Sequence, residues 1–410
     1  MQTQQLVDHF FRTEYGKAVS HLTSRFGSIH LELAEDSVQE ALIKAMQTWP
    51  YAQVPDNPTG WILRVAGNKM IDHLRREQKN TKSDHLPEHA EDPPATISLE
   101  AINDDLLRML FACCHPSLSS EYQIILTLKI LGGLSVREIS SALLKKEETV
   151  AKAYTRAKKK FKVEEIKLQL PPAHEIENRL EIVLKIIYLL FNEGYKSAEG
   201  EHLIRHELCQ EAVRLNKVLV DSEIGNTPSA TALMALMHFH SARFQARTDQ
   251  DGNIITLEKQ DRSLWDQTLI RQGLDYLEKA YTTDEINEYT VQAAISATHC
   301  RAPSFDQTDW ISILKLYDLQ LSVNASPVVE LNRVIPLEKV HGSLLALKEL
   351  ERLEATQFFE NYYLFYAIKA EIQEHLNDLD GCRESLQMAL KLTKNQREQA
   401  HLTQKLSMLT

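Results

Sequence analysis

The chain has few of the residues that interrupt or cross-link secondary structure. Its 410 residues include 13 glycines, 13 prolines and five cysteines. The cysteines form no Cys-x-x-Cys pair and no disulfide framework, so we expect a reduced, cytoplasmic protein. Few runs alternate polar with apolar residues as exposed strands would. Together with the low glycine and proline content, this scarcity predicts an all-α fold.

Long hydrophobic runs are also missing. The longest, 182–191, is too short to span a bilayer and contains Lys185. The segment 1–16 is polar and mixed in charge, unlike a signal peptide, so no membrane partner is expected. The sequence has no phosphate-binding loop, dinucleotide fingerprint or nucleophile elbow. We therefore expect no catalysis, no cofactor and no bound metal.

A net positive charge is lacking as well, since the formal net charge is −11, which at first disfavours nucleic acid as a partner. The charge is uneven, however: residues 1–163 hold 21 basic and 20 acidic residues, whereas 164–410 hold 25 and 37. The length predicts two or three domains, and two polar, proline-containing stretches predict linkers at 79–97 and 163–174. The resulting blocks are 1–78, 98–162 and 175–410.

The middle block predicts two short helices joined by a tight turn. Ser135 and Glu138 have the spacing of a capping box that starts the first helix. The second, from 149 to 161, has apolar residues at three- or four-residue spacing on its inward face: Val150, Ala153, Ala157 and Phe161. Residues 145–162 carry eight basic and two acidic side chains, mostly off this face. The pattern is typical of a DNA-binding helix-turn-helix, and the alternative is a solvated basic helix without a ligand.

The first block predicts two helices of opposite charge. Residues 33–46 form an amphipathic pattern with a carboxylate-rich outer face: Glu35, Asp36, Gln39 and Glu40. After a turn at Asn57-Pro58, Trp61 opens a second helix through Arg76, and residues 64–82 carry six basic and two acidic side chains. An aromatic ring beside cations suits single-stranded nucleic acid, because bases stack on rings while cations follow the backbone. The alternative is that Trp61 belongs to the hydrophobic core.

The last block predicts a large helical domain. One helix pair has the residue sizes of a tetratricopeptide repeat at Tyr366, Ala370, Asn377, Cys382, Leu386 and Ala389. A fainter pair surrounds Trp310, Ile313 and Tyr317. Stacked helix pairs form a concave surface, so we expect a protein partner or a regulatory role, and the alternative is a purely stabilising domain. The acidity of this block favours a basic partner or keeps DNA away.

Two further pairs of side chains, one of histidines and one of cysteines, are of types that bind metals. His202 and His206 lie one helical turn apart and offer two zinc ligands, but the spacing fixes no third. Cys113 and Cys114 follow an apolar helix, and we expect both to be buried small hydrophobic residues.

The order of these segments is more specific than any one of them. Residues 34–41 (AEDSVQEA), 57–76 (NPTGWILRVAGNKMIDHLRR) and 134–139 (LSVREI) resemble an RNA polymerase sigma factor of the extracytoplasmic-function (ECF) type, and the resemblance covers 1–163. The extension is similar to the subgroup with a tetratricopeptide-like domain, through the segments 191–195, 260–265 and 326–333. Two features depart from the pattern: the turn at 145–148 has no glycine or proline, and Asn253 replaces a basic residue in the loop 251–253.

The resemblance implies a sigma factor that binds bacterial core RNA polymerase, at the clamp helices of the largest subunit and the flap, and directs promoter recognition. It implies contacts to the clamp helices from Asp36, Gln39 and Glu40. It implies contacts to the −10 element from Asn57, Trp61, Arg64, Asn68, Lys69, Asp72, Arg75 and Arg76. It implies contacts to the −35 element from Glu148, Thr149, Lys152, Ala153, Arg156, Lys158, Lys159 and Lys160, the last three on phosphates. We expect the C-terminal domain to regulate this activity in cis.

Two other function classes remain open at the sequence level. One is a helical-repeat adaptor that binds a partner through 175–410 and carries a degenerate N-terminal half. The other is an enzyme, which only the His202 and His206 pair suggests.

Overall fold

A computed structural model describes residues 2–49, 54–81, 99–143, 145–196, 199–200, 204–281 and 286–409. The first expected linker, 79–97, therefore lies almost wholly outside the described residues. The chain divides into two compact units. Unit 1 consists of 1–191 and 210–219, and unit 2 of 192–209 and 220–410.

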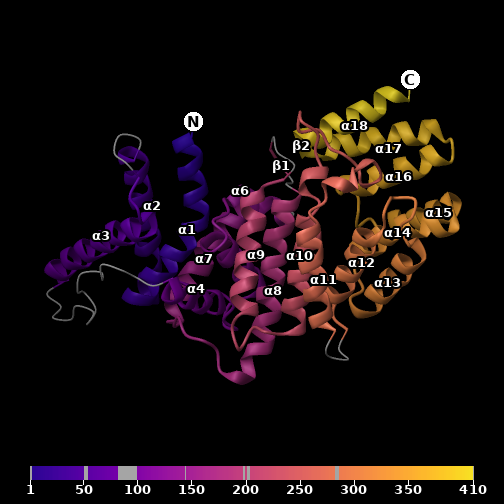
Figure 1. Cartoon of the computed structure of the whole chain (residues 1–410). Helices are drawn as coiled ribbons and strands as arrows, with labels where there is room; N and C mark the ends of the chain where they lie inside the picture. The colour runs from indigo at the N-terminus through magenta and orange to yellow at the C-terminus, as the bar shows by residue number, and fades with distance from the viewer. Residues whose placement is uncertain are drawn as a thin grey trace. The chain divides into compact units, whose positions relative to one another are not determined.

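Unit 1 is built from helices alone among its described residues (Figure 1). They are α1 (Gln2–Phe26), the 3-10 turn η1 (Ser28–His30), α2 (Leu31–Thr48), α3 (Pro58–Thr81), α4 (Leu99–Cys113), α5 (Ser120–Ile130), α6 (Val136–Ala142), α7 (Glu147–Val163), most of α8 (Ala173–Tyr195) and most of α9 (His206–Val220). α1 packs against α2, α3 and α4, while α5 packs against α7. Its largest fully buried side chains include Phe111, Phe161 and Leu22.

Unit 2 contains the remaining helices and two very short strands. They are β1 (Glu199–Gly200), α10 (Pro228–Ser241), the 3-10 turns η2 (Phe244–Ala246), η3 (Leu257–Lys259) and η4 (Arg262–Leu264), α11 (Gln267–Ala280), α12 (Glu288–Arg301), α13 (Trp310–Val323), α14 (Pro327–His341), α15 (Ser343–Glu354), α16 (Tyr363–His375), α17 (Leu379–Leu392), β2 (Lys394–Asn395) and α18 (Gln396–Met408). β1 and β2 pair in parallel, with Glu199 opposite Lys394 and Gly200 opposite Asn395.

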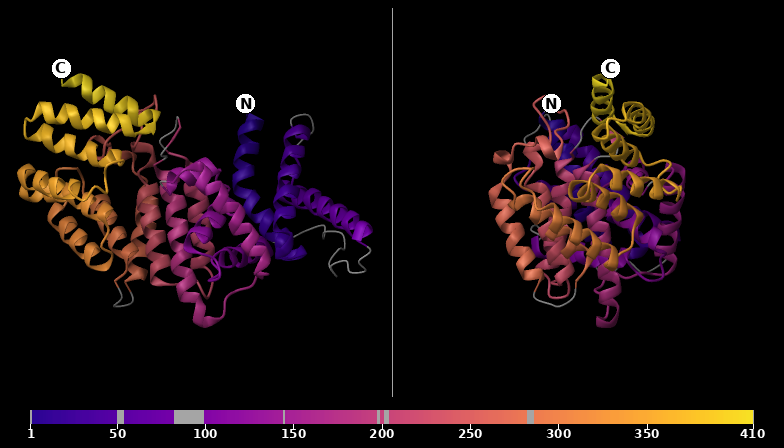
Figure 2. Two further views of the ribbon diagram at one scale, coloured as in Figure 1. Left: turned by 180° about the vertical axis from the view of Figure 1, so that it is seen from behind. Right: turned by 90° about the vertical axis from the view of Figure 1, so that its right-hand side faces the viewer.

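Within unit 2, α10 is apolar on nearly all sides and packs against α11 and α12. Successive helices then pack in pairs, and the views of Figures 1 and 2 agree that α16, α17 and α18 lie side by side. The helix pair expected around Tyr366 is present. Ala370, Cys382, Leu386 and Ala389 are buried in one cluster with Tyr366 packed against it.

The two units exchange chain segments. α8 begins in unit 1 and its last residues, from Asn192, belong to unit 2. The chain returns to unit 1 at Gln210 within α9 and leaves it again at Val220. Within unit 1, Arg179 on α8 donates from Nη1 to the carbonyl of Phe111 at 3.3 Å and pairs with Glu175. The beginning of the C-terminal region is therefore part of the N-terminal unit.

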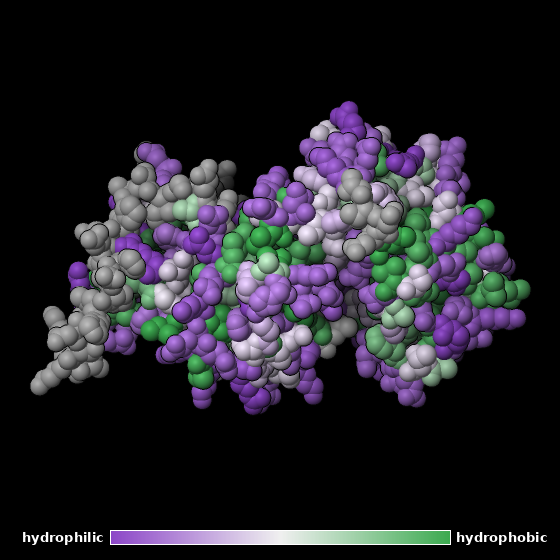
Figure 3. Space-filling model, turned by 90° about the horizontal axis from the view of Figure 1, so that it is seen from below, coloured by the Kyte–Doolittle hydropathy of each residue, from purple (hydrophilic) through white to green (hydrophobic). Residues whose placement is uncertain are grey.

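The surface is mixed in character. Figure 3 shows hydrophobic side chains exposed among hydrophilic ones on one face of the molecule. The exposed hydrophobic residues of unit 2 include Ile311, Leu344 and Leu345, which are 58%, 70% and 45% exposed. Among the described residues, no helix has the length and apolar character needed to cross a bilayer.

Candidate nucleic-acid and polymerase interface

The first candidate surface is the outer side of α2. Asp36, Gln39 and Glu40 are exposed, as the amphipathic pattern predicts. The opposite side is held in unit 1 by buried apolar residues at three- or four-residue spacing: Leu31, Ala34, Val38, Ala41, Leu42 and Ala45. The helix therefore presents two carboxylates and an amide to a partner without disturbing its own packing.

The second candidate surface lies on α3. The helix begins at Pro58, three residues before the expected start at Trp61, because the Asn57 side chain accepts a hydrogen bond from the Gly60 N–H at 2.9 Å and proline suits the first helical position. Ile62, Ala66 and Met70 are buried. The exposed residues among those expected to contact the −10 element are Asn57, Arg64, Asn68, Asp72, Arg75 and Arg76.

Two further residues of this surface have intramolecular partners. Trp61 is half-buried, and its ring meets the Trp49 ring edge-on at 5.5 Å between centroids. It is thus neither a fully buried core residue nor a free platform for a base. Lys69 forms an ion pair with Glu40 of α2, which joins the first two candidate surfaces. Because both side chains are largely exposed, this pair contributes little to stability, about 0–1 kcal/mol.

The third candidate surface belongs to α6 and α7, which form the predicted helix-turn-helix. The capping box is confirmed: the Glu138 amide donates to Ser135 Oγ at 3.2 Å and the Ser135 amide to Glu138 Oε2 at 2.6 Å. The inward face of α7 is also confirmed, with Val150, Ala153, Ala157 and Phe161 buried. The exposed residues among those expected to contact the −35 element are Glu148, Thr149, Lys152, Arg156 and Lys159, and Lys160 is half-buried.

Two residues expected to contact the −35 element face the protein. Ala153 is only 7% exposed because it lies on the same side of α7 as Val150 and Ala157, so its methyl group is not on the outer face. The expected base contact from Ala153 is therefore incompatible with this packing. Lys158 points toward α2, where its ammonium lies 3.1 Å from Glu35 and 3.5 Å from Glu32.

Glu35 is the residue that sequence reasoning misplaced. It was expected on the outer face of α2, but it is 4% exposed and joins α1, α2 and α7. Its carboxylate accepts hydrogen bonds from the hydroxyls of Tyr15, at 3.0 Å, and Tyr154. Burial and the adjacent Glu35 charge raise the pKa of both tyrosines, so both remain protonated donors. Together with Lys158, these groups form what we name the Glu35 cluster: Tyr15, Glu35, Tyr154 and Lys158.

The remaining cysteine and histidine predictions concern chemistry rather than nucleic acid. Cys113 and Cys114 are fully buried, as expected, and burial raises the pKa of both thiols, that of Cys114 to about 12. His202 lies outside the described residues, so the two-histidine zinc hypothesis stays untested. No group of three or more potential metal ligands occurs within the part of the chain that the structure describes.

Known protein families match these regions in the same order along the chain. Residues 11–80 match Sigma-70 region 2, and residues 108–161 match Sigma-70, region 4. An uncharacterized protein of Rhizobium meliloti (strain 1021) is 34% identical over 386 residues, which cover 93% of this chain and 90% of that protein. The chain therefore carries the sigma-70 region 2 and region 4 domains of a sigma factor. Residues 179–281 of this sigma factor match a family of unknown function (DUF6596), and no solved structure matches.

The two sigma-70 domain matches give the three surfaces their context. As a sigma-70 protein with region 2 and region 4, the chain binds core RNA polymerase and promoter DNA in transcription initiation. α2 and α3 lie in region 2, and α6 and α7 in region 4. The expected sigma regions are confirmed. The tetratricopeptide assignment of the extension stays a prediction, because the family that matches 179–281 has no described function.

Proposed function

We propose that this sigma factor is of the extracytoplasmic-function type and that its three exposed helix faces contact three partners. The observation that supports this most is the separation of faces: α2, α3 and α7 each bury an apolar side and expose a polar or cationic one. Cationic faces suit DNA, and a carboxylate-bearing face suits a basic protein groove.

The proposed contact of α2 is with core polymerase, at the clamp helices of the largest subunit. Asp36, Gln39 and Glu40 are exposed there, and Glu40 forms an exposed pair with Lys69. Docking on a basic groove would exchange this weak internal pair for contacts with the polymerase. The polymerase flap is the second proposed docking point of the protein on the core enzyme.

The proposed contact of α3 is with the melted −10 element. Arg64, Arg75 and Arg76 are exposed cations that can follow a strand backbone. The exposed part of the Trp61 ring is available to a base, and the Trp49 ring fixes its orientation. Asn57, Asn68, Lys69 and Asp72 complete the proposed surface.

The proposed contact of α7 is with the duplex of the −35 element. Glu148, Thr149 and Lys152 lie in its first two turns, where a recognition helix meets base edges. Arg156 follows on the same exposed side, and Lys159 and Lys160 are proposed to bind phosphates. We leave Ala153 out of the proposed surface, and we include Lys158 only in a state in which the Glu35 cluster has opened.

The decisive experiment is run-off transcription with core polymerase on a promoter mapped by sequencing transcripts after overexpression. We expect the full chain to stimulate transcripts from this promoter, and Arg75→Ala/Arg76→Ala and Lys152→Ala to reduce them at least tenfold. Arg271→Ala on α11 removes an exposed cation outside the proposed surfaces and should keep wild-type output. A full chain that neither joins core polymerase nor stimulates transcripts contradicts the proposal.

Salt dependence separates the proposed base contacts from the phosphate contacts. Lys159→Ala should weaken promoter binding about equally on matched and unmatched sequences and lower the slope of log affinity against log salt by about one. Lys152→Ala should instead relax preference at one position of the −35 element. If the two variants changed the salt slope and the sequence preference of promoter binding equally, the division of roles along α7 would be contradicted.

We further propose that unit 2 regulates initiation in cis. The support is its physical continuity with unit 1 through α8 and α9 and the acidity of the C-terminal region. Truncation after residue 220 keeps both of these helices, whereas truncation at 174 removes helices that unit 1 contains. Promoter output of the longer truncated form should differ from that of the full chain at equal protein level. Unchanged output would contradict cis regulation without affecting the sigma-factor assignment.

A further inference from the structure

A small cavity of unit 2 gathers more positive than negative charge. Its volume is about 180 Å³, and its polar lining consists mainly of Tyr195, Lys196, Arg243, Arg247, Gln260 and Glu398. We name it the arginine cavity. Three of these side chains are cations and one is a carboxylate, so the described lining carries a formal charge of +2. Buried charges in proteins are normally paired, and an excess of this size calls for a counter-ion.

Arg247 is the most deeply buried of the three cations, at 9% exposure. Its guanidinium donates from Nη1 to the carbonyl oxygen of Tyr195 and lies 3.7 Å from the centroid of the Tyr195 ring. Among the described residues, no carboxylate lies within ion-pair distance of it. Burial lowers the pKa of Arg247, with the positive charge of Arg243 adding to the effect. A buried guanidinium held in place but left without an anion is an unfilled binding group.

Arg243 is held in a similar way. Its Nε and Nη2 both donate to Gln260 Oε1 at 3.3 Å, and the Gln260 amide nitrogen donates to the Ile255 carbonyl at 3.1 Å. The guanidinium also lies over the Trp265 ring, 5.2 Å from its centroid. Neutral groups therefore fix its position, and they leave its charge uncompensated within the described part of the unit.

Lys196 is the cation that has a carboxylate partner. Its ammonium lies 3.3 Å from Glu398, which also accepts a hydrogen bond from the Tyr363 hydroxyl at 3.0 Å. Burial nevertheless lowers the pKa of Lys196. The same field acts on His240 beside the cavity: burial, with the charges of Arg243 and Arg247, lowers its pKa to about 3. The imidazole is thus neutral at pH 7 and adds no further positive charge.

A short hairpin forms the other side of the arginine cavity. Thr248 pairs with Ile254, and the Ile255 amide donates to the Arg247 carbonyl at 2.8 Å, which brings Ile255 and Thr256 into the lining. Asn253 closes the hairpin, because its side-chain amide donates to Asp249 at 2.9 Å. The loop 251–253, in which asparagine replaces a basic residue, therefore has this asparagine in a structural position next to the cavity.

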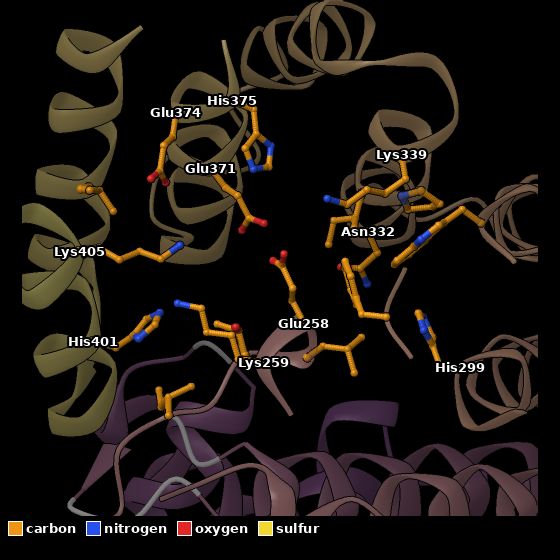
Figure 4. A pocket seen from close by; sticks show the side chains of 18 of the residues that line it. Glu258, Lys259, His299, Asn332, Lys339, Glu371, Glu374, His375, His401 and Lys405 are labelled. Carbon is orange, nitrogen blue, oxygen red and sulfur yellow. The ribbon is translucent and has the colours of Figure 1, made fainter. Parts of the chain in front are cut away.

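A neighbouring cavity of unit 2 has balanced charges in its lining. It has a volume of about 540 Å³, and Figure 4 shows charged side chains from several helices around its open space. Its lining contains equal numbers of carboxylates and ammonium groups: Glu258, Glu371, Glu374, Lys259, Lys339 and Lys405. This larger cavity therefore selects no ligand by charge, whereas the arginine cavity does.

We propose that the arginine cavity binds a phosphate group, with Arg243 and Arg247 as its principal ligands and Lys196 as the third cation. A phosphate or phosphate monoester carries a charge close to −2 at pH 7, which matches the excess, and guanidinium groups suit its oxygens. The space also fits a small anion of this kind. The phosphate group belongs either to the free ion or to a small phosphorylated metabolite. Its binding makes unit 2 sensitive to the concentration of that compound.

The test is calorimetric titration and thermal unfolding of the full chain, in phosphate-free buffer, with inorganic phosphate and separately with ribose 5-phosphate. Sodium chloride at matched ionic strength is the control ligand. We expect saturable binding and an increase in Tm that grows with phosphate concentration. Tighter binding of either compound supports the site and identifies the source. Absence of binding by both, or an equal Tm increase with chloride, overturns the proposal.

Variants separate a binding site from a structural role. Arg247→Met and Arg243→Gln should weaken phosphate binding at least tenfold, whereas Arg271→Gln, exposed on α11, should bind as the wild type does. Because Arg247 lacks a described anionic partner, Arg247→Met should unfold at a Tm equal to or above that of the wild type without phosphate. Should either variant fail to fold, the other variant and Lys196→Gln carry the same comparison. Phosphate stabilisation that is equal in the wild type and in the folded variants overturns the proposal.

Discussion

At the scale of single residues, Glu35 is the most consequential side chain of unit 1. Its carboxylate receives two tyrosine hydroxyls and one ammonium, from α1 and from α7. Removing an acceptor while its donors stay buried costs the desolvation of those donors. The Glu35 cluster therefore links region 2 to region 4 by polar contacts that a substitution can weaken selectively.

We expect Glu35→Gln to lower the free energy of unfolding of unit 1 by about 1–3 kcal/mol, because the buried tyrosines and Lys158 lose a charged acceptor. Glu32→Gln is the matched control: Glu32 also faces Lys158, at 3.5 Å, but is 61% exposed. Urea unfolding followed by helical circular dichroism measures both. A cost for Glu32→Gln as large as that for Glu35→Gln would contradict the importance of burial at this cluster.

Two histidines of unit 2 predict a pH dependence of stability. Burial, with nearby arginine charges, lowers the pKa of both His240 and His299 to about 3. Between pH 6.5 and 3 the unfolded chain binds protons at these positions that the folded chain does not, so stability falls as the pH falls. At pH 5 we expect a loss of about 2 kcal/mol per histidine relative to pH 7.

The fluorescence of Trp265 and Trp310, which belong to unit 2, reports this unfolding during urea titration at pH 7 and pH 5. His240→Asn and His299→Asn should each reduce the difference between the two pH values, whatever they do to stability at pH 7. His174→Asn, at an exposed histidine of unit 1, should leave the difference unchanged. A difference between pH 7 and pH 5 that is as large in both buried variants as in the wild type would contradict the assignment.

At the scale of helices, local chemistry decides where each begins. The capping box at Ser135 starts α6 and thereby fixes the angle at which the chain enters the helix-turn-helix. We expect Ser135→Ala to lower the free energy of unfolding by about 0.5–2 kcal/mol and to weaken binding to the −35 element. Ser135→Thr retains a hydroxyl and should recover most of both. Thermal unfolding and a DNA-binding assay give the two values, and equal losses for alanine and threonine would contradict a capping role.

Helix faces were predictable from the sequence because they depend on residues three or four positions apart. The buried sides of α2 and α7, the capping box and the pair α16–α17 all follow from such short spacings. α3 begins three residues before the predicted start, because Asn57 and Pro58 cap this helix, whereas the sequence pattern predicts a separate turn there.

The Glu35 cluster was not predictable in the same way. Its other members lie 20, 119 and 123 residues from Glu35. The spacing of Glu35 from the buried Leu31 and Val38 places it on the buried side of α2, but local spacing does not show which distant side chains meet its carboxylate. The burial of Glu35 depends on where α7 packs, which is a tertiary property. The arginine cavity was not predictable from local spacing either, since its lining residues are spread along the chain from Tyr195 to Glu398.

At the scale of the molecule, the Glu35 cluster sets a requirement for promoter binding. If α3 and α7 read the −10 and −35 elements, the two helices act about 25 base pairs apart, or about 85 Å along B-DNA at 3.4 Å per base pair. The Lys158 ammonium, however, lies 3.1 Å from Glu35 on α2. On the proposed roles, region 2 and region 4 must separate before both elements are bound.

A short, cleavable thiol cross-linker between Glu32→Cys and Lys158→Cys tests this requirement. The native cysteines interfere little, because four are buried and Cys300 is half-buried. We expect the cross-linked protein to lose at least tenfold in transcription from a promoter with both elements and to recover once the linker is cleaved. The single-cysteine variants, treated with the same reagent, are the controls. Full activity in the cross-linked state would contradict the requirement for opening.

The exchange of segments between the units has a consequence for synthesis of the protein. Region 2 and region 4 are complete by residue 163, yet unit 1 also needs 210–219. At a ribosomal rate of 5–20 residues per second, this last part emerges roughly 3–11 s after region 4. During that interval the newly synthesised region 2 and region 4 lack α9, which completes unit 1. The order of translation therefore delays completion of unit 1 until the ribosome has begun the segment that leads into unit 2.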